Sequence, residues 1–157
     1  MPQQKIRTSQ THYSAGSDMG GNTKHGMGDG KASKLAGKRA LVVEDEFFVA
    51  LEVEEALQSF GCETVGPFLN LEKAMAAADR EDFDLAVLDI NLDRTMAYPL
   101  ADELNEKKIP FVFVTGYAEN DLPEKYRLEV RVQKPFAFFE LRRAIEDRLS
   151  WNDPPRS

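Results

Sequence analysis

Cysteine is almost absent from this sequence, which has Cys62 as its single cysteine in 157 residues. One cysteine cannot form a disulfide within the chain, and such low usage is typical of a reducing compartment. We therefore expect a cytoplasmic protein that is held together by a hydrophobic core. With 42% hydrophobic and 30% charged residues, the composition indicates a globular domain, and the length allows one domain but not comfortably two.

Long apolar runs and basic clusters are also missing. No window approaches the ~18 uninterrupted apolar residues of a transmembrane helix, and the amino terminus lacks the apolar core of a signal peptide. Residues 37–157 hold 15 Lys and Arg against 25 Asp and Glu. A region this acidic lacks the clustered basic side chains that neutralise nucleic-acid phosphates, so we predict neither a membrane nor a nucleic-acid partner.

Residues 1–36 are rich in small and polar side chains and show no helical or strand period. They cannot bury enough apolar surface to offset the entropy of ordering, so we predict a flexible tail. His12 and His25 lie in this tail without the spacing of metal ligands, and we interpret them as solvated. We place the folded domain at 37–150 and a short second tail at 151–157.

From residue 38 onward, strand and helix patterns alternate five times. The predicted strands cover 40–43, 62–66, 85–88, 111–114 and 130–133. Helical patterns follow the strands at 46–60, 71–78, 99–108 and 138–149, and the segment 90–98 is expected to be a loop. Between residues 119 and 126 we expect a short, poorly patterned helix that Pro123 interrupts or starts late. This alternation, with right-handed connections, predicts an α/β fold in which helices cover both faces of a parallel sheet.

The stretch Leu85–Leu88 is apolar without alternation, which is typical of a fully buried parallel strand. Asp89 follows at its carboxyl end, the edge at which ligands bind in open α/β sheets. Because the carboxyl ends of parallel strands meet, we expect Glu44 and Asp45, which follow the first strand, to lie beside Asp89. Two carboxylates about 4 Å apart repel by roughly 4 kcal/mol at an effective dielectric near 20, so the cluster needs a cation.

All-oxygen ligands with open coordination positions favour Mg²⁺. Thr115 and Lys134 follow the fourth and fifth strands, and they add a hydroxyl donor and a fixed positive charge at the same edge. Metal, ammonium and hydroxyl together suit the oxygens of a transferring phosphoryl group, with Asp89 as the nucleophile. The residues therefore predict phosphoryl transfer to Asp89, assisted by Thr115 and Lys134.

Four segments resemble the motifs of the receiver domain of two-component response regulators. They read Leu-Val-Val-Glu-Asp-Glu (41–46), Val-Leu-Asp-Ile-Asn-Leu (87–92), Phe-Val-Thr-Gly-Tyr (113–117) and Gln-Lys-Pro-Phe (133–136). The resemblance covers about residues 38–150. It implies a flavodoxin-like (CheY-like), doubly wound, five-stranded parallel sheet in the order 2-1-3-4-5, phosphorylated by a histidine kinase or a phosphotransfer protein.

The resemblance also assigns roles to residues at the strand ends. Asp89 would accept the phosphoryl group, and Asp45, Asp89 and the Asn91 carbonyl would bind Mg²⁺, with Glu44 assisting. Thr115 would be the switch hydroxyl. A protein of this type is not an enzyme, and with only about seven residues after the last helix we expect a single domain whose output is contact with another protein.

Two further features narrow the resemblance. Lys134 would bind the phosphate, before what is usually a cis proline, Pro135. The family usually has an aromatic residue three positions before this lysine, but here Arg131 occupies that position, and Tyr117 is a candidate substitute. The segment 110–117 is similar to the FAT GUY response regulators, of which many are stand-alone and some serve bacterial stress signalling, although Val114 replaces the alanine of that motif.

Two enzyme classes conflict with the residues. A haloacid dehalogenase phosphatase needs a general acid two positions after its nucleophile, where this sequence has Asn91. A nucleotide-binding enzyme needs a glycine-rich loop after the first strand, and residues 44–48 are Glu-Asp-Glu-Phe-Phe. The remaining alternative is a receiver fold that binds proteins independently of phosphorylation or acts as a phosphate sink.

Overall fold

The computed structural model describes residues 33–116 and 122–152. A parallel sheet lies at the centre of this part of the chain, with the strand order β2-β1-β3-β6-β7. Its strands are β1 (Arg39–Val43), β2 (Glu63–Phe68), β3 (Leu85–Asp89), β6 (Phe111–Thr115) and β7 (Arg131–Gln133). This confirms the predicted fold class and the expected order 2-1-3-4-5, counted over these strands. The expected tail with His12 and His25, and also Tyr117, lie outside the described residues.

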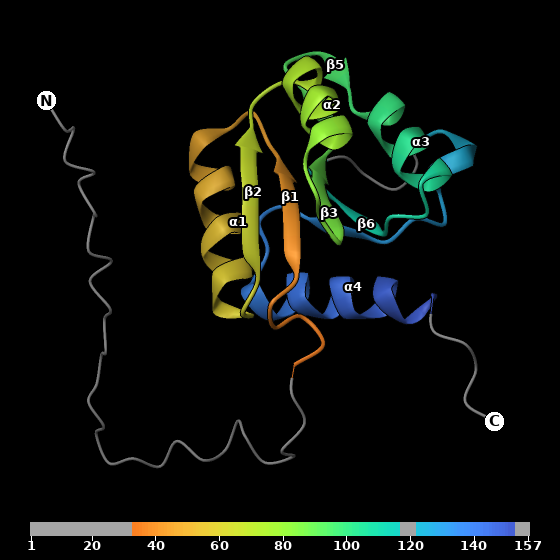
Figure 1. The fold of residues 1–157 in the computed structure, drawn as a ribbon. Coiled ribbons are helices and arrows are strands. Elements are labelled where there is room, and N and C mark those ends of the chain that lie inside the picture. The colour runs from red at the N-terminus through yellow and green to blue at the C-terminus, as the bar shows by residue number, and fades with distance from the viewer. Residues whose placement is uncertain (1–32, 117–121, 153–157) are drawn as a thin grey trace, which may run out of the picture. The chain divides into compact units, whose positions relative to one another are not determined.

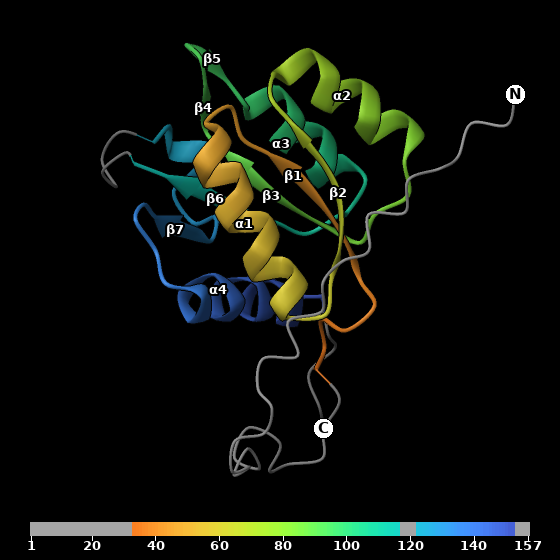
Figure 2. The same cartoon turned by 90° about the vertical axis from the view of Figure 1, so that its left-hand side faces the viewer.

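Helices cover both faces of the sheet (Figures 1 and 2). The helices α1 (Phe47–Ser59) and α4 (Phe138–Ser150) pack on one face, and α2 (Leu71–Arg80) and α3 (Tyr98–Glu106) pack on the other. In β1, Leu41 contributes to the core beside α2 and α3, whereas Val42 contributes to the core beside α1 and α4. Apart from Arg39, Asp89 and Thr115 at their ends, the strands β1, β3 and β6 are apolar, because helices shield both faces of the sheet from water. Within the described ranges, no helix has the length and apolar character needed to cross a membrane.

The helix ends follow local signals in the sequence. The Asn70 side chain accepts a hydrogen bond from the Lys73 backbone N–H at 2.9 Å, which caps α2 as predicted. Gly61 follows α1 with a φ of 89°, the left-handed conformation in which many helices end. Pro99 lies in the first turn of α3, where its missing N–H costs no helical hydrogen bond.

The strand β2 is longer than predicted, because it continues through Gly66 and Pro67 to Phe68. Glycine and proline usually mark the end of a strand, and for this reason the sequence predicted an end at Gly66. Here Gly66 has a φ of 107°, and the pairing with β1 shifts register at this point. A Cβ atom at Gly66 would lie 2.9 Å from the carbonyl oxygen of Val42, so the close approach of the two strands requires glycine.

The segment 90–98 is not the plain loop that we expected. It contains the antiparallel strands β4 (Asn91–Leu92) and β5 (Thr95–Met96), joined by Asp93 and Arg94 with φ of 51° and 69°. Positive φ at both residues is typical of a tight hairpin turn. The Asn91 side chain accepts a hydrogen bond from the Arg94 N–H at 2.8 Å. Because Asp-Arg lacks the glycine of most such turns, the sequence did not indicate a hairpin.

The short helix predicted between residues 119 and 126 starts late, after Pro123, as the sequence indicated. Its described part, which starts at residue 122, contains a short 3-10 helix, η3 (Glu124–Tyr126). The preceding Pro123 has an extended backbone, with φ of −54° and ψ of 146°, so the helix cannot include it. The segment has too few apolar residues to bury a longer helix, and it is held instead by Tyr126, which is buried.

The folded part of the chain begins before the expected boundary at Gly37. Leu35 is fully buried in the core beside α1 and α4. Its carbonyl oxygen accepts a hydrogen bond from the Cys62 thiol at 3.4 Å, and the Gly37 N–H donates to the Gly61 carbonyl at 2.8 Å. A single leucine among polar residues gives no period, so the sequence alone assigned it to the tail.

We expect the substitution Leu35→Ala to lower the free energy of unfolding by about 2–4 kcal/mol, because it leaves a cavity in the core. Leu128→Ala is the matched control, since Leu128 is 89% exposed. That control should change stability by less than about 0.5 kcal/mol. Chemical denaturation of both variants measures the difference, and equal stabilities would contradict the burial of Leu35.

Candidate functional site

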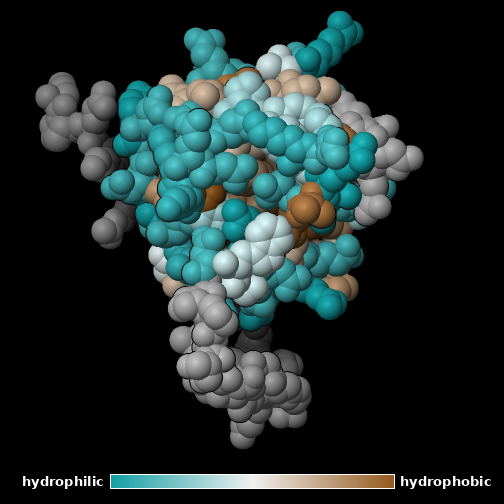
Figure 3. Space-filling model, turned by 90° about the vertical axis from the view of Figure 1, so that its right-hand side faces the viewer, coloured by the Kyte–Doolittle hydropathy of each residue, from teal (hydrophilic) through white to brown (hydrophobic). Residues whose placement is uncertain are grey.

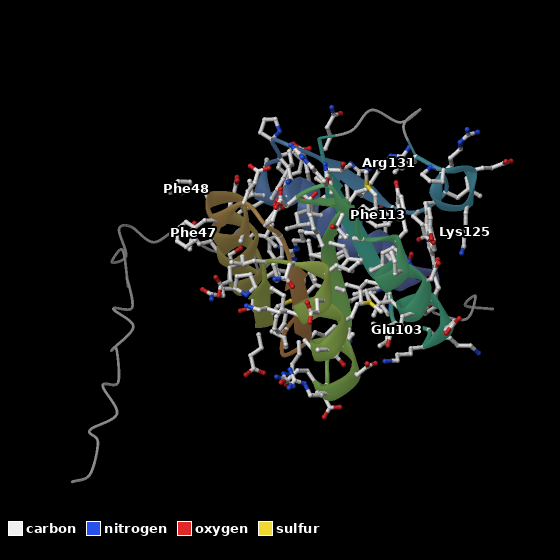
Figure 4. All side chains as sticks on the ribbon, turned by 90° about the horizontal axis from the view of Figure 1, so that it is seen from above. Phe47, Phe48, Glu103, Phe113, Lys125 and Arg131 are labelled. Carbon is white, nitrogen blue, oxygen red and sulfur yellow. The ribbon has the colours of Figure 1, made fainter. Side chains whose placement is uncertain are left out.

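The strand ends gather the predicted site residues at one edge of the sheet. Asp89 and Thr115 are the last residues of β3 and β6, and Glu44 and Lys134 directly follow β1 and β7. The parallel register pairs Asp89 with Val114 and Thr115 with Gln133, so these strands end at nearly the same level. Figure 4 looks onto this edge, toward which β1 and β2 point in Figure 1.

Lys134 is the positive centre of this edge. In the described part of the chain its Nζ lies 2.9 Å from a Glu44 carboxylate oxygen, 3.4 Å from Asp89 and 3.7 Å from Glu46. Its backbone N–H donates to the Thr115 carbonyl at 2.9 Å, and the peptide bond to Pro135 is cis, as the resemblance implied. Burial alone lowers the pKa of Lys134, but the hydrogen bond to Glu44 and the charge of Asp89 outweigh it and raise that pKa. The ammonium group therefore stays charged.

Glu44 is a buried carboxylate with an ion-pair partner for one oxygen and a hydrogen-bond donor for the other. Its exposed fraction is 2%. One oxygen lies beside Lys134, and the other accepts a hydrogen bond from the Glu46 backbone N–H at 3.1 Å. A buried carboxylate is costly unless it is paired in this way. Glu44 therefore fixes the position of Lys134 below the surface of the site.

Asp89 is the most strongly perturbed acid of the site. It is 5% exposed, and one of its oxygens accepts a hydrogen bond from the Asn91 N–H at 3.3 Å. Burial and the neighbouring Glu44 charge raise the pKa of Asp89 to about 8, although Lys134 partly opposes this change. Asp45 raises it further. The ionised form of Asp89 is thus disfavoured in the protein alone, and a bound cation would stabilise it.

The acids at this edge fit a divalent cation. Carboxylate oxygens of Glu44, Asp45 and Glu46 lie within 4.8 Å of one another. The Asp45 side chain also interacts with the Asp89 carboxyl group. Only oxygen donors are present in this group, which suits Mg²⁺. Glu46 was missed as a site residue, because we interpreted it only as the start of a helix. The available signal was the run of three consecutive acids.

A surface pocket of about 240 Å³ opens beside Asp89. Its other lining residues are Glu46, Asn91, Gly116 and Lys134. Since a water molecule occupies about 30 Å³ in the liquid, this space can hold a phosphoryl group together with several waters. The structure therefore brings two carboxylates and an ammonium group around one small, polar, solvent-accessible space.

An aromatic cluster lies next to the site. Phe113 is two residues before Thr115 on β6, so both side chains are on the same face of that strand. Tyr98 and Tyr126 stack with ring centroids 4.5 Å apart, and each meets Phe113 edge to face, at 6.4 and 6.2 Å. Such pairs add about 0.5–1.5 kcal/mol beyond their buried area. Sequence reasoning missed this cluster because its rings come from three separate segments.

Polar contacts attach η3 to α3 beside this cluster. The Tyr126 hydroxyl donates a hydrogen bond to Asp102, whose carboxylate also lies 2.8 Å from the Lys125 Nζ. Lys125 and Tyr126 together hold the pKa of Asp102 below its usual range. Arg131, at the position where an aromatic residue was expected, donates instead to the Arg127 carbonyl at 3.1 Å. Figure 4 shows Phe113, Lys125 and Arg131 on the side of this edge opposite Phe47 and Phe48.

Comparison with known proteins identifies relatives of this chain. Residues 40–146 match the family model of the response regulator receiver domain. The transcriptional regulatory protein PdtaR of Mycobacterium tuberculosis is 31% identical over 117 residues, which cover 72% of this chain and 57% of that protein. The chain thus spans little more than half the length of this relative.

Solved structures are similar over the same region. SdrG from Sphingomonas melonis Fr1 is 29% identical with a TM-score of 0.65, and the match covers 73% of this chain and 98% of that one. The response regulator PhyR from Brucella abortus is 26% identical with a TM-score of 0.68, covering 81% of this chain and 54% of that one.

We expect Asp89→Asn to stabilise the protein in the absence of divalent cations, by several kcal/mol near pH 8. With its pKa raised to about 8, folded Asp89 keeps a proton that the unfolded chain loses above about pH 4. Wild-type stability therefore falls as pH rises through this window. The gain from Asp89→Asn should grow with pH and level off above about pH 8.

Thermal or urea unfolding in EDTA at several pH values measures this gain. Asp93→Asn is the matched control, because Asp93 is exposed and asparagine tolerates its positive φ. A gain from Asp89→Asn that is constant, or that shrinks as pH rises, would contradict the prediction.

Proposed function

We propose that this chain, which belongs to the family of response regulator receiver domains, accepts a phosphoryl group on Asp89 and signals through contact with another protein. The donor would be a histidine kinase or a phosphotransfer protein. The observation that carries this proposal is the position of Lys134, 3.4 Å from the Asp89 carboxylate at the wall of the same pocket. A nucleophilic oxygen and a fixed cation beside a phosphoryl-sized space are the parts that phosphoryl transfer needs.

Mg²⁺ would be held by Asp45, Asp89 and the Asn91 carbonyl, with Glu44 assisting. When bound, it would supply charge neutralisation for the carboxylates and for the phosphoryl oxygens. The chain's own groups do the rest. An oxygen of ionised Asp89 forms a bond to phosphorus while the bond between phosphorus and the donor's histidine nitrogen breaks. The Lys134 ammonium then faces the added negative charge.

The same residues favour a product that remains on the protein. Asn91 lies where a phosphatase of the haloacid dehalogenase type has its general acid, so the chain has no carboxylic acid there to assist hydrolysis. We therefore propose a phosphorylated signalling state and not enzymatic turnover. The likeness of residues 110–117 to FAT GUY response regulators supports a role in bacterial stress signalling, in the cytoplasm.

We propose that the aromatic cluster transmits the phosphorylated state. A hydroxyl at Thr115 that turns toward phosphorylated Asp89 would change the end of β6 and with it the surroundings of Phe113. Because Phe113 contacts both Tyr98 and Tyr126, the change would reach α3 and η3. This route needs no aromatic residue at position 131.

Exposed apolar side chains support the proposal that this chain binds another protein, either the phosphodonor or the target of the signal. In the first turn of α1, directly after Glu46, Phe47 is 68% and Phe48 81% exposed. Phe139 at the start of α4 is 69% exposed. The face that Figure 3 shows is mostly hydrophilic, with small and separate hydrophobic patches. Exposed aromatic residues of this kind are enriched at protein interfaces.

Incubation of the protein with Mg²⁺ and phosphoramidate should add the mass of one phosphoryl group, as measured by intact mass spectrometry. Asp89→Asn should gain none, because the nucleophilic oxygen is replaced by an amide. No mass gain in the wild type, or a gain that survives Asp89→Asn, would refute phosphorylation at this residue. A pull-down that captures the same partner with wild type and Asp89→Ala would favour the phosphorylation-independent alternative.

Tyr126→Phe should lower the free energy of unfolding by about 1 kcal/mol, because it removes the hydrogen bond to the half-exposed Asp102 carboxylate but keeps the stacked ring. If the aromatic cluster transmits the signal, phosphorylated Tyr126→Phe should show altered amide hydrogen exchange over 122–128 relative to phosphorylated wild type. Tyr98→Phe keeps the same ring contacts and serves as the control. Identical exchange in all three proteins would contradict the proposed route.

A further inference from the structure

Glu46 has an unusual position for a residue at the start of a helix. It occupies the N-cap position of α1, yet among the described residues its side chain makes no capping hydrogen bond. Its backbone N–H instead donates to Glu44, and its side chain lines the pocket beside Asp89. Short polar side chains usually fill this position to cap the helix. The Glu46 carboxylate is thus available to the pocket and not to the helix.

Lys134 is shared unequally by its three carboxylate neighbours. The Glu44 carboxylate, at 2.9 Å, is buried and cannot exchange Lys134 for water without a large cost. The Glu46 carboxylate, at 3.7 Å, has a side chain that is 65% exposed, so water can replace Lys134 there at little cost. Glu46 therefore adds little to the stability of the site. Its main physical effect is a negative charge at the pocket wall.

This charge acts on any anion that enters. A free phosphodonor with two negative charges must come within several ångströms of Glu46, and it competes with Glu46 for the Lys134 ammonium. A phosphoryl group carried by a protein meets the same charge, but that protein gains contacts outside the pocket, for example with the exposed Phe48 beside it. The repulsion from Glu46 therefore disfavours the approach of small phosphodonors more than that of protein-borne ones.

We infer that Glu46 is a specificity-determining residue that disfavours small dianionic phosphodonors relative to protein-borne ones, an inference that rests on the proposed phosphorylation of Asp89. For acetyl phosphate, the step forms a bond between an Asp89 oxygen and phosphorus, breaks the bond from phosphorus to the acyl oxygen and releases acetate. Glu46 takes no part in these bonds. It changes only how readily the dianion reaches them.

The test compares rates of phosphorylation by acetyl phosphate, followed by intact mass at saturating Mg²⁺ and low ionic strength. Glu46→Gln, which removes the charge and keeps the shape, should react about three- to tenfold faster than wild type. Glu46→Asp keeps the charge and should therefore react more slowly than Glu46→Gln. Glu55→Gln is the matched control, because Glu55 is an exposed acid on the same helix, about 13 Å farther along its axis.

Two further measurements separate charge from a change in structure. The gain of Glu46→Gln should shrink toward onefold near 1 M salt, where the Debye length is about 3 Å. It should also be smaller with phosphoramidate, which carries less negative charge. A structural effect of the substitution would persist at high salt and with both donors.

The outcomes distinguish this inference from the proposed function. If phosphoramidate labels wild type at Asp89 but Glu46→Gln is no faster than wild type with acetyl phosphate, the role of Glu46 is refuted and phosphorylation stands. A gain that is independent of salt, or equal in Glu55→Gln, also refutes it. If neither donor labels any variant at Asp89, the proposed function fails and this inference fails with it.

Discussion

The ion pair between Lys134 and the buried Glu44 is the interaction on which the site depends. It compensates the burial of Glu44 and fixes the ammonium group 3.4 Å from Asp89. Lys134 opposes the rise in the pKa of Asp89 that burial and the Glu44 charge cause, so without Lys134 that pKa would be higher still. The pair thus combines a structural task with a chemical one, because the cation that stabilises the buried acid also faces the pocket.

The acids around Lys134 are buried to different extents, and for this reason they have different roles. Glu44 is almost inaccessible to solvent, and its role is to hold the Lys134 ammonium group in place. Asp89, with its pKa raised to about 8, is the acid whose ionised form a bound cation would stabilise most. Glu46 is exposed, and its charge influences what approaches. A similar run of carboxylates on an exposed loop would lack this division, because all its members would be solvated equally.

Aromatic packing joins β6, next to the site, with α3 and η3. Phe113 lies on the same strand face as Thr115, and it contacts rings from α3 and η3 that a hydrogen bond to Asp102 holds together. A packed cluster of this kind has few alternative arrangements, so a small change at one ring must be accommodated by its neighbours. Arg131 has a backbone partner in Arg127 and is not needed for this route.

Hydrophobic periods and caps are local, and parallel strands end at a common edge, so the amino-acid sequence was enough to predict the five strands of the central sheet, most helices and the residues at the strand ends. Asp89, Lys134 and their acidic neighbours are among these residues. The burial of Leu35, the position of Glu46 at the pocket and the stacking of Tyr98 on Tyr126 became visible only in the folded chain. Each of these features depends on contacts between segments far apart in the chain, and a local sequence pattern does not show which distant segments will meet.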